Sequence, residues 1–121
     1  AALMGKIDLG TGGVIITSTA DELEFDDQGG RSPDFISRFF TPQAELFEDD
    51  VTGSAHCTLA PFWGDRLNRN HLVAYQASAR GGWLSLVLHS VGEPASPDEG
   101  KVWISGRAVT YLSGVIRLVE S

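Results

Sequence analysis

The chain has 121 residues, 42% of them hydrophobic and 21% charged, which is the composition of one compact globular domain. The formal net charge of −7 argues against nucleic acid and against an anionic membrane surface as partners, since both attract clusters of Lys and Arg. No apolar run is long enough to span a bilayer, and the first ten residues lack the basic start and apolar block of a signal peptide. We therefore predict a single domain, residues 1–121, in a cytoplasmic protein.

Short runs of β-branched and aromatic residues, separated by turn residues, predict a β-rich domain. We expect strands at residues 14–17, 35–40, 72–76, 83–88 and 102–106, and a final hairpin formed by residues 109–112 and 115–118. Polar segments containing Gly and Pro, residues 21–34 and 92–100, are predicted to be loops. Because short turns join successive strands, we expect neighbouring strands to be antiparallel.

Residues 52–67 form the exception, because their pattern predicts the one helix of the domain. The first turns hold few polar residues, which is typical of a helix that is buried on most sides. Pro61 removes one helical hydrogen bond, so we expect a kink or a tightening there. Trp63, Trp83 and Trp103 are expected to lie in the core around this helix.

The start of the expected helix carries the most informative pattern. Residues 48–50 are acidic and are followed closely by Thr52, Gly53 and Ser54. The free N–H groups of a helix start bind anions, and a glycine lets a ligand approach the backbone closely. Asp49 lies where it would exchange a proton with a bound acid. The pattern thus predicts either a site for a small carboxylic acid or the ordinary helix caps that Asp and Ser most often provide.

Five motifs, in matching order, resemble signatures of the PhzF-like (phenazine biosynthesis-like) family, which has the diaminopimelate-epimerase fold. The match runs from about Gly13 to the C-terminus. The motifs are DFISRFFTP at residues 34–42 (D-F-x-S-R-x-F-x-P in the family), EDDVTGSAH at 48–56 (E-D-P-V-T-G-S-A-H), APFW at 60–63 (P-Y-W), YQASARGG at 75–82 (Q-x-S-x-R-G-G) and ISGRA at 104–108 (I-x-G-x-A).

The resemblance implies an α+β fold in which an antiparallel, β-barrel-like sheet wraps around one central hydrophobic helix. It also implies that the chain is half of a diaminopimelate-epimerase-like fold, equivalent to most of the C-terminal domain of PhzF-like proteins. Family members bind substrate between two such domains and isomerise it by moving a proton, without a metal or an organic cofactor. By motif match, Asp49 is the active-site aspartate, Ser54 contacts the substrate, and the amides of Gly53 and Ser54, beside Thr52, hold its carboxylate.

The sequence departs from the family pattern at three places. Asp50 stands where the family has proline, and residues 45–47 are Glu-Leu-Phe where the family usually has Gly-Ile-Pro. The third departure is the largest, because no counterpart of the family's first domain, with its catalytic glutamate, is present in these 121 residues. Whether the chain is an enzyme is therefore left open by the resemblance.

Two kinds of function follow. In the first, the chain is an isomerase-type domain whose cleft is completed by a second copy or by a complementary N-terminal-domain chain. In a homodimer, Asp49 of one copy would face Asp49 of the other. In the second, the chain is a non-catalytic remnant that binds a small carboxylate or only dimerises.

The remaining reactive side chains favour structural roles. Cys57 is predicted to be a buried free thiol, and as the single cysteine it excludes an internal disulfide. His56 is predicted to be a satisfied core residue. With His71 and His89 it shows no metal-ligand spacing, so no metal site is expected. Residues 80–82, Arg-Gly-Gly, predict a turn, or an arginine paired with an acidic loop residue.

Overall fold

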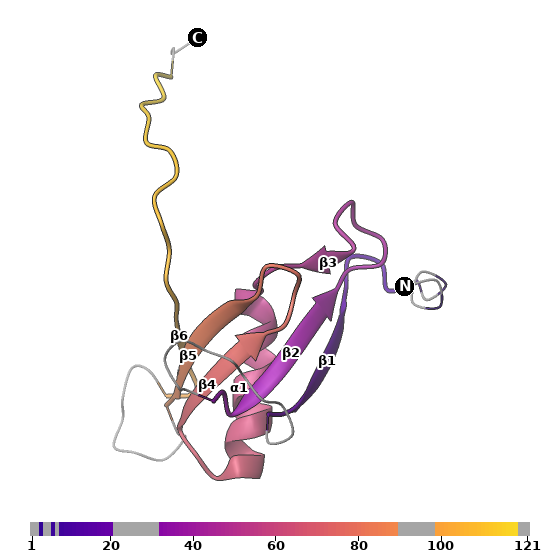
Figure 1. The fold of residues 1–121 in the computed structure, drawn as a ribbon, viewed down its shortest axis with the longest axis vertical. Helices are drawn as coiled ribbons and strands as arrows, with labels where there is room; N and C mark the ends of the chain where they lie inside the picture. The colour runs from indigo at the N-terminus through magenta and orange to yellow at the C-terminus, as the bar shows by residue number, and fades with distance from the viewer. Residues whose placement is uncertain (1–2, 4–5, 7, 21–31, 90–98, 119–121) are drawn as a thin grey trace.

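A computed structural model describes residues 3, 6, 8–20, 32–89 and 99–118. Within these residues one helix packs against one face of a six-stranded sheet (Figure 1). The elements in chain order are β1 (Val14–Thr19), β2 (Phe35–Phe40), β3 (Glu48–Asp49), α1 (Gly53–Leu67), β4 (His71–Gln76), β5 (Gly82–Leu88) and β6 (Val102–Ser105). α1 and four of the five longer strands lie within one residue of their predicted bounds. β1 extends two residues beyond its predicted end at residue 17, and β3 was not predicted.

The sheet is mixed and open. Its order is β1-β2-β4-β5-β6, and β3 pairs with β2 off this path. The pairing of β2 with β4 is parallel, with Phe35 opposite Ala74, and the other pairs are antiparallel. The antiparallel prediction is wrong at this pair because α1 lies between the two strands in sequence, and a helical crossover returns the chain in the same direction.

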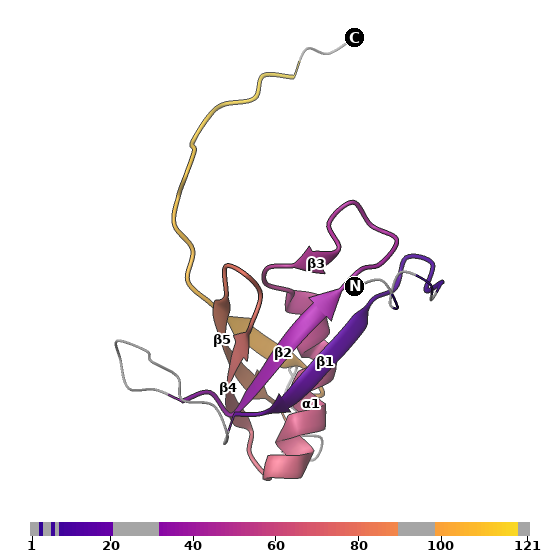
Figure 2. The ribbon, with the colours of Figure 1, turned by 45° about the vertical axis from the view of Figure 1, so that its right-hand side comes forward.

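The sheet does not close into a barrel, which corrects the barrel-like expectation. β1 and β6 are its two edges, and no described strand joins them (Figure 2). A sheet of this length covers α1 from one side only.

The core lies between the sheet and α1. Alternate side chains of the strands point toward the helix, as expected for a pleated sheet with one buried face. Phe35 is fully buried at the centre, stacked on Trp63 with ring centroids 5.8 Å apart. Trp63 also donates a hydrogen bond from Nε1 to Thr17 Oγ1 at 2.9 Å, which fixes α1 to β1. The buried cluster is completed by Leu59, Ala60, Leu72, Ala74, Leu84 and Leu86.

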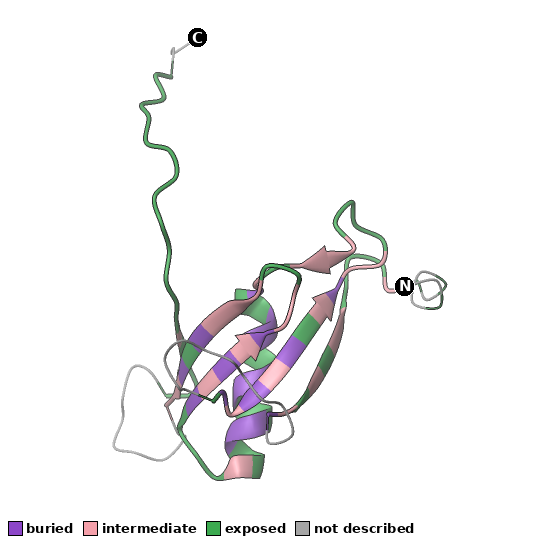
Figure 3. Ribbon diagram, in the orientation of Figure 1, coloured by how far each residue is buried: buried purple, intermediate pink, exposed green. Residues whose placement is uncertain are grey.

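One face of α1 is buried and the opposite face is exposed (Figure 3). The buried positions, spaced by three or four residues, are Ala55, His56, Leu59, Ala60, Trp63 and Gly64. Phe62 and Cys57 lie on the open side, so the predictions of a helix buried on most sides and of a buried Cys57 are wrong. The helix continues through Pro61 to Leu67 and ends at Asn68 in the left-handed conformation, φ 51°.

Of the three tryptophans, Trp63 alone lies in the core. Trp83 and Trp103 each precede a residue that faces α1, namely Leu84 and Ile104, so both point to the other face of the sheet. Trp83 is half-buried against Tyr75, and Trp103 is 56% exposed. The prediction that these two belong to the core is therefore wrong.

Residues 106–118 form no strand and leave the body of the molecule after β6 (Figures 1 and 3). The predicted hairpin at 109–112 and 115–118 is therefore wrong. A two-stranded hairpin is marginal without a sheet or helix to pack on. The predicted loops fall largely on residues 21–31 and 90–98, outside the described residues. No helix in the described part of the chain is long and apolar enough to cross a membrane.

Candidate functional site

The acidic segment before α1 is held to the sheet by an arginine. β3 pairs with the end of β2, with Asp49 opposite Phe39. Arg38 binds both carboxylate oxygens of Glu48, from Nε and from Nη2, each at 2.8 Å. The hydrogen bond and charge of Arg38 lower the pKa of the Glu48 carboxyl, and Glu48 in turn raises the pKa of Arg38. Both oxygens of the Glu48 carboxylate are therefore used in the ion pair with Arg38. Asp49 is the next carboxylate along the chain.

A fully buried glutamine fixes the backbone on which Asp49 sits. Gln76, the last residue of β4, accepts a hydrogen bond from Thr52 N at 2.8 Å through Oε1. Its Nε2 donates to the carbonyl of Asp49 at 2.9 Å and to Thr52 Oγ1 at 3.0 Å. Sequence reasoning missed this residue. The available signal was a polar side chain at a core-facing position of an alternating strand.

Thr52 connects Asp49 to the helix. It occupies the N-cap position with φ −117° and ψ 102°, yet its side chain makes no cap hydrogen bond. Its hydroxyl instead donates to Asp49 Oδ2 at 2.6 Å. The Asp49 carboxylate is half-buried and is held one hydroxyl away from the first turn of α1.

His56 supports the same segment from inside the helix. It has no exposed surface, and its Nδ1 lies 2.7 Å from the carbonyl oxygen of Thr52. A carbonyl only accepts, so Nδ1 carries the proton and donates it to this bond. Burial lowers the pKa of His56, which keeps the ring neutral. The core position matches the prediction, but Nε2 has no hydrogen-bond partner among the described residues.

The first turn of α1 is open to solvent. Gly53 and Ser54 are exposed, and a Cβ added at Gly53 would meet nothing within 4 Å. The first turn holds no acidic side chain. The structure thus brings Asp49, Thr52, Gly53 and Ser54 together at one end of α1. Their roles in binding and catalysis stay predictions.

The turn between β4 and β5 contacts the segment that precedes α1. Ser78 Oγ donates to the carbonyl of Asp50 at 2.8 Å and accepts from Gly81 N at 2.9 Å. Gly81 has φ +74°, which a residue with a Cβ rarely adopts. Arg80 Nε lies 3.7 Å from Asp50 Oδ2. Both predicted roles of residues 80–82, a turn and an arginine paired with an acidic residue, are therefore present.

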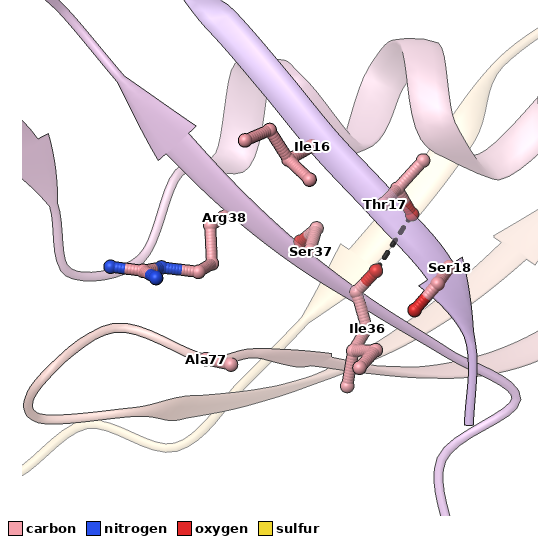
Figure 4. Close-up of a pocket in the computed structure, with 7 residues that line it drawn as sticks. All are labelled: Ile16, Thr17, Ser18, Ile36, Ser37, Arg38 and Ala77. Carbon is pink, nitrogen blue, oxygen red and sulfur yellow. Dashed lines mark hydrogen bonds between the residues drawn. The ribbon is translucent and has the colours of Figure 1, made fainter. Parts of the chain in front are cut away.

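Two other kinds of site find no support among the described residues. Among the described residues, no group of three or more His, Cys, Asp or Glu side chains could hold a metal ion. A shallow hollow lies over β1 and β2 and is shown in Figure 4. Its one charged side chain, Arg38, already binds Glu48. The start of α1 therefore remains the candidate site.

Comparison with known proteins shows the family of the chain. A family model described as phenazine biosynthesis-like protein (PhzC-PhzF) matches residues 18–114, which include the whole site. The chain belongs to the phenazine biosynthesis-like (PhzF-like) family. The resemblance inferred from the five motifs is thereby confirmed.

Two bacterial relatives are named as uncharacterized isomerases. The protein from Halalkalibacterium halodurans is 41% identical over 117 residues, which cover 97% of this chain and 37% of that protein. One from Pseudomonas aeruginosa is 51% identical over 89 residues, covering 74% of this chain and 31% of that protein. The PhzF-like chain described here thus spans about a third of the length of these relatives.

Two solved structures have a fold similar to that of this chain. The crystal structure of a PhzC/PhzF protein from Clostridium difficile superposes with a TM-score of 0.65 at 35% identity, covering 88% of this chain and 34% of that one. A PhzF family protein from Enterococcus faecalis gives a TM-score of 0.57 at 43% identity, covering 71% of this chain and 29% of that one. The PhzF-like chain is thus a partial domain of α+β class.

Proposed function

We propose that the chain is the carboxylate-binding half of a PhzF-like isomerase, which moves a proton within a small carboxylic acid, cyclic acids included, without a cofactor. The observation that carries the proposal is the meeting of uncapped helix amides and the half-buried Asp49 carboxylate at one end of α1. In this proposal residues 1–121 correspond to most of the C-terminal domain of a PhzF-like protein. The names of the isomerase relatives support the reaction class.

Each part of the site has a chemical task. The amides of Gly53 and Ser54, at the positive end of the helix dipole, bind the substrate carboxylate. Ionised Asp49 takes a proton from a substrate carbon, and the electron pair left behind is delocalised toward the bound carboxylate. Where a C=C bond of the substrate is conjugated with this carbanion, the double bond shifts and the proton returns at a different carbon, so substrate and product are isomers and no oxidant or reductant is consumed.

In this proposal a second polypeptide completes the cleft. The helix start is open, β1 and β6 are sheet edges, and the C-terminal segment carries large apolar side chains in solvent. Exposed edges and contiguous apolar groups are typical of surfaces that another chain covers. The exposed apolar residues of this segment are Val109, Tyr111, Leu112, Val115, Ile116 and Leu118.

A second copy of the chain or a complementary N-terminal-domain chain would fill this role. In a homodimer the two helix starts would face one shared cleft. Asp49 of one copy would take the proton from one carbon, and Asp49 of the other copy would deliver a proton to another carbon.

The proposal is tested by a deuterium-exchange screen. Small cyclic and acyclic carboxylic acids are incubated in D₂O with the chain alone, and with the chain mixed with the N-terminal two thirds of the Halalkalibacterium halodurans relative. Proton NMR then records loss of carbon-bound hydrogen and formation of an isomer. Exchange in either mixture, absent without protein, supports the proposal. No exchange of any acid in either mixture argues against it.

A second candidate is a non-catalytic module that binds a small carboxylate or only dimerises. The observation that favours it is Asp50, which replaces the proline of the family motif and lies exposed beside Arg80. Without that proline the backbone next to Asp49 is less firmly fixed, which disfavours an accurately placed catalytic carboxylate. Binding of a carboxylate without deuterium exchange would identify this function.

A further inference from the structure

Thr52 has the backbone of a helix N-cap but does not act as one. Its φ of −117° and ψ of 102° are those of an N-cap residue, and yet no side-chain cap hydrogen bond is made. A threonine here normally accepts a hydrogen bond from the amide two or three positions on, which are Ser54 and Ala55 in this chain. Something holds the hydroxyl away from the helix.

The hydroxyl is held by two partners. Thr52 Oγ1 accepts from Gln76 Nε2 at 3.0 Å and donates its only hydrogen to Asp49 Oδ2 at 2.6 Å. These two bonds fix the direction of the hydroxyl toward Asp49.

The glutamine itself has little freedom to turn. Gln76 has no exposed surface, and both ends of its amide are engaged by backbone groups. Oε1 accepts from Thr52 N and Nε2 donates to the carbonyl of Asp49, at 2.8 and 2.9 Å. A flipped amide would place oxygen against a carbonyl and nitrogen against an N–H group, so only one orientation satisfies the bonds.

We propose that Gln76 is a positioning residue that keeps the Thr52 hydroxyl off the start of α1, so that the first amides of the helix stay free for a carboxylate. This inference rests on the proposed function and assigns to Gln76 a role in ligand affinity. Without Gln76, the hydroxyl rotates to cap the helix and competes with the ligand for the Ser54 amide.

A merely structural glutamine has a different signature. Its loss would lower stability and leave the helix start as exposed as before. Loss of a positioning glutamine instead increases protection of the Ser54 and Ala55 amides from hydrogen exchange while weakening anion binding. The two roles are therefore separated by amide exchange measured under conditions where the protein stays folded.

The experiment compares the wild-type chain with Gln76→Met, which keeps the volume and removes the amide. Hydrogen exchange of Ser54 and Ala55 is followed by ¹⁵N NMR, and benzoate is titrated against the Gly53 and Ser54 amides. We expect exchange roughly fivefold to tenfold slower in Gln76→Met, the size of an added cap, and a benzoate Kd raised by a similar factor. Adding Thr52→Val to Gln76→Met removes the competing hydroxyl and restores fast exchange. Gln43→Met, an exposed glutamine, is the matched control.

The outcomes are distinct. Unchanged Ser54 and Ala55 exchange in folded Gln76→Met overturns the inference. If Gln76→Met does not fold, hydrogen exchange of the wild-type chain still tests the inference. Protected Ser54 or Ala55 amides would mean that Thr52 already caps the helix, which would overturn the inference. Benzoate that shifts neither amide in the wild-type chain counts against the proposed function, while the exchange comparison still tests Gln76.

Discussion

The hydroxyl of Thr52 donates to Oδ2 of Asp49 at 2.6 Å, although Thr52 is the N-cap residue of α1. One side chain thus orients the candidate acid-base group, while the backbone that follows offers the anion site. The two parts of the proposed chemistry are one hydrogen bond apart. We therefore expect a substitution of Asp49 to affect proton transfer, and a substitution at the helix start to affect carboxylate binding.

Asp49→Asn is expected to abolish proton transfer without unfolding the domain. The amide still accepts from Thr52 but no longer takes a proton, and a positioned acid-base group contributes about 10²- to 10⁴-fold to rate. Deuterium exchange of a responsive carboxylic acid measures the loss. Asp50→Asn makes the same change in charge one residue away, at an exposed position, and is expected to keep the rate within about threefold. Equal rates for Asp49→Asn and wild type would remove Asp49 from the mechanism.

Gly53→Ala is expected to weaken carboxylate binding while the fold is unaffected. A Cβ at this position meets no atom of the described chain within 4 Å, so stability should change by less than about 0.5 kcal/mol. The methyl group would instead stand where a bound carboxylate approaches the amide, and we expect affinity to fall by about tenfold. NMR titration with benzoate measures the change. Gly114→Ala, also without neighbours within 4 Å, should bind as wild type does.

Gly82→Ala is expected to disturb the site from the neighbouring turn. A Cβ at Gly82 would clash with Cγ2 of Val51, in the segment between Asp49 and the helix. Overpacking of this kind costs about 1–3 kcal/mol, which urea unfolding would detect. Gly106→Ala is the control, since its nearest neighbour, the carbonyl oxygen of Trp83, lies at an ordinary 3.6 Å. Equal stability of the two variants would mean that Val51 moves aside freely.

Protonation of His56 is expected to destabilise the fold in mild acid. Burial lowers the pKa of His56 below its ordinary 6.5, so the unfolded chain binds this proton at a higher pH than the folded chain. Stability should therefore fall as the pH is lowered from 6.5 toward the folded pKa, by at most about 1.4 kcal/mol per pH unit for one proton. Urea unfolding between pH 7.5 and about pH 5 measures the slope.

The control for this pH dependence is a pair of substitutions. His56→Gln keeps a donor for the Thr52 carbonyl but does not titrate, so its slope over this range should be smaller. His71→Gln, at an exposed position, should keep the wild-type slope. A wild-type slope that survives in His56→Gln would assign the effect to another group.

Local patterns in the sequence predicted the elements well but not the relations between them. β-branched runs located β1, β2, β4 and β5, and the acidic approach to Gly53 located the start of α1. The parallel pairing of β2 with β4 and the open sheet were missed, because strand pairing depends on the crossover and on which strands the chain contains. Trp103 was misplaced because its residue type says nothing about which face of β6 it occupies.

In the site, too, neighbours in sequence could be predicted and a contact between distant segments could not. Asp49, Thr52, Gly53 and Ser54 are close in sequence, so a motif was enough to group them. Gln76 enters from β4, and only the folded chain shows its buried amide against the backbone of Asp49 and Thr52. Whether residues 106–118 are exposed also depends on whether another strand or helix of the fold lies where they can pair with it.

The central claim, that a second chain completes the cleft at Asp49, is tested most directly by solution mass. Light scattering over a dilution series compares the chain with one that ends at Ser105 and lacks the exposed apolar segment. A homodimer predicts about twice the 13.0 kDa of one chain for residues 1–121, persisting at low concentration. A mass of 13.0 kDa at every concentration would contradict a shared cleft made from two copies.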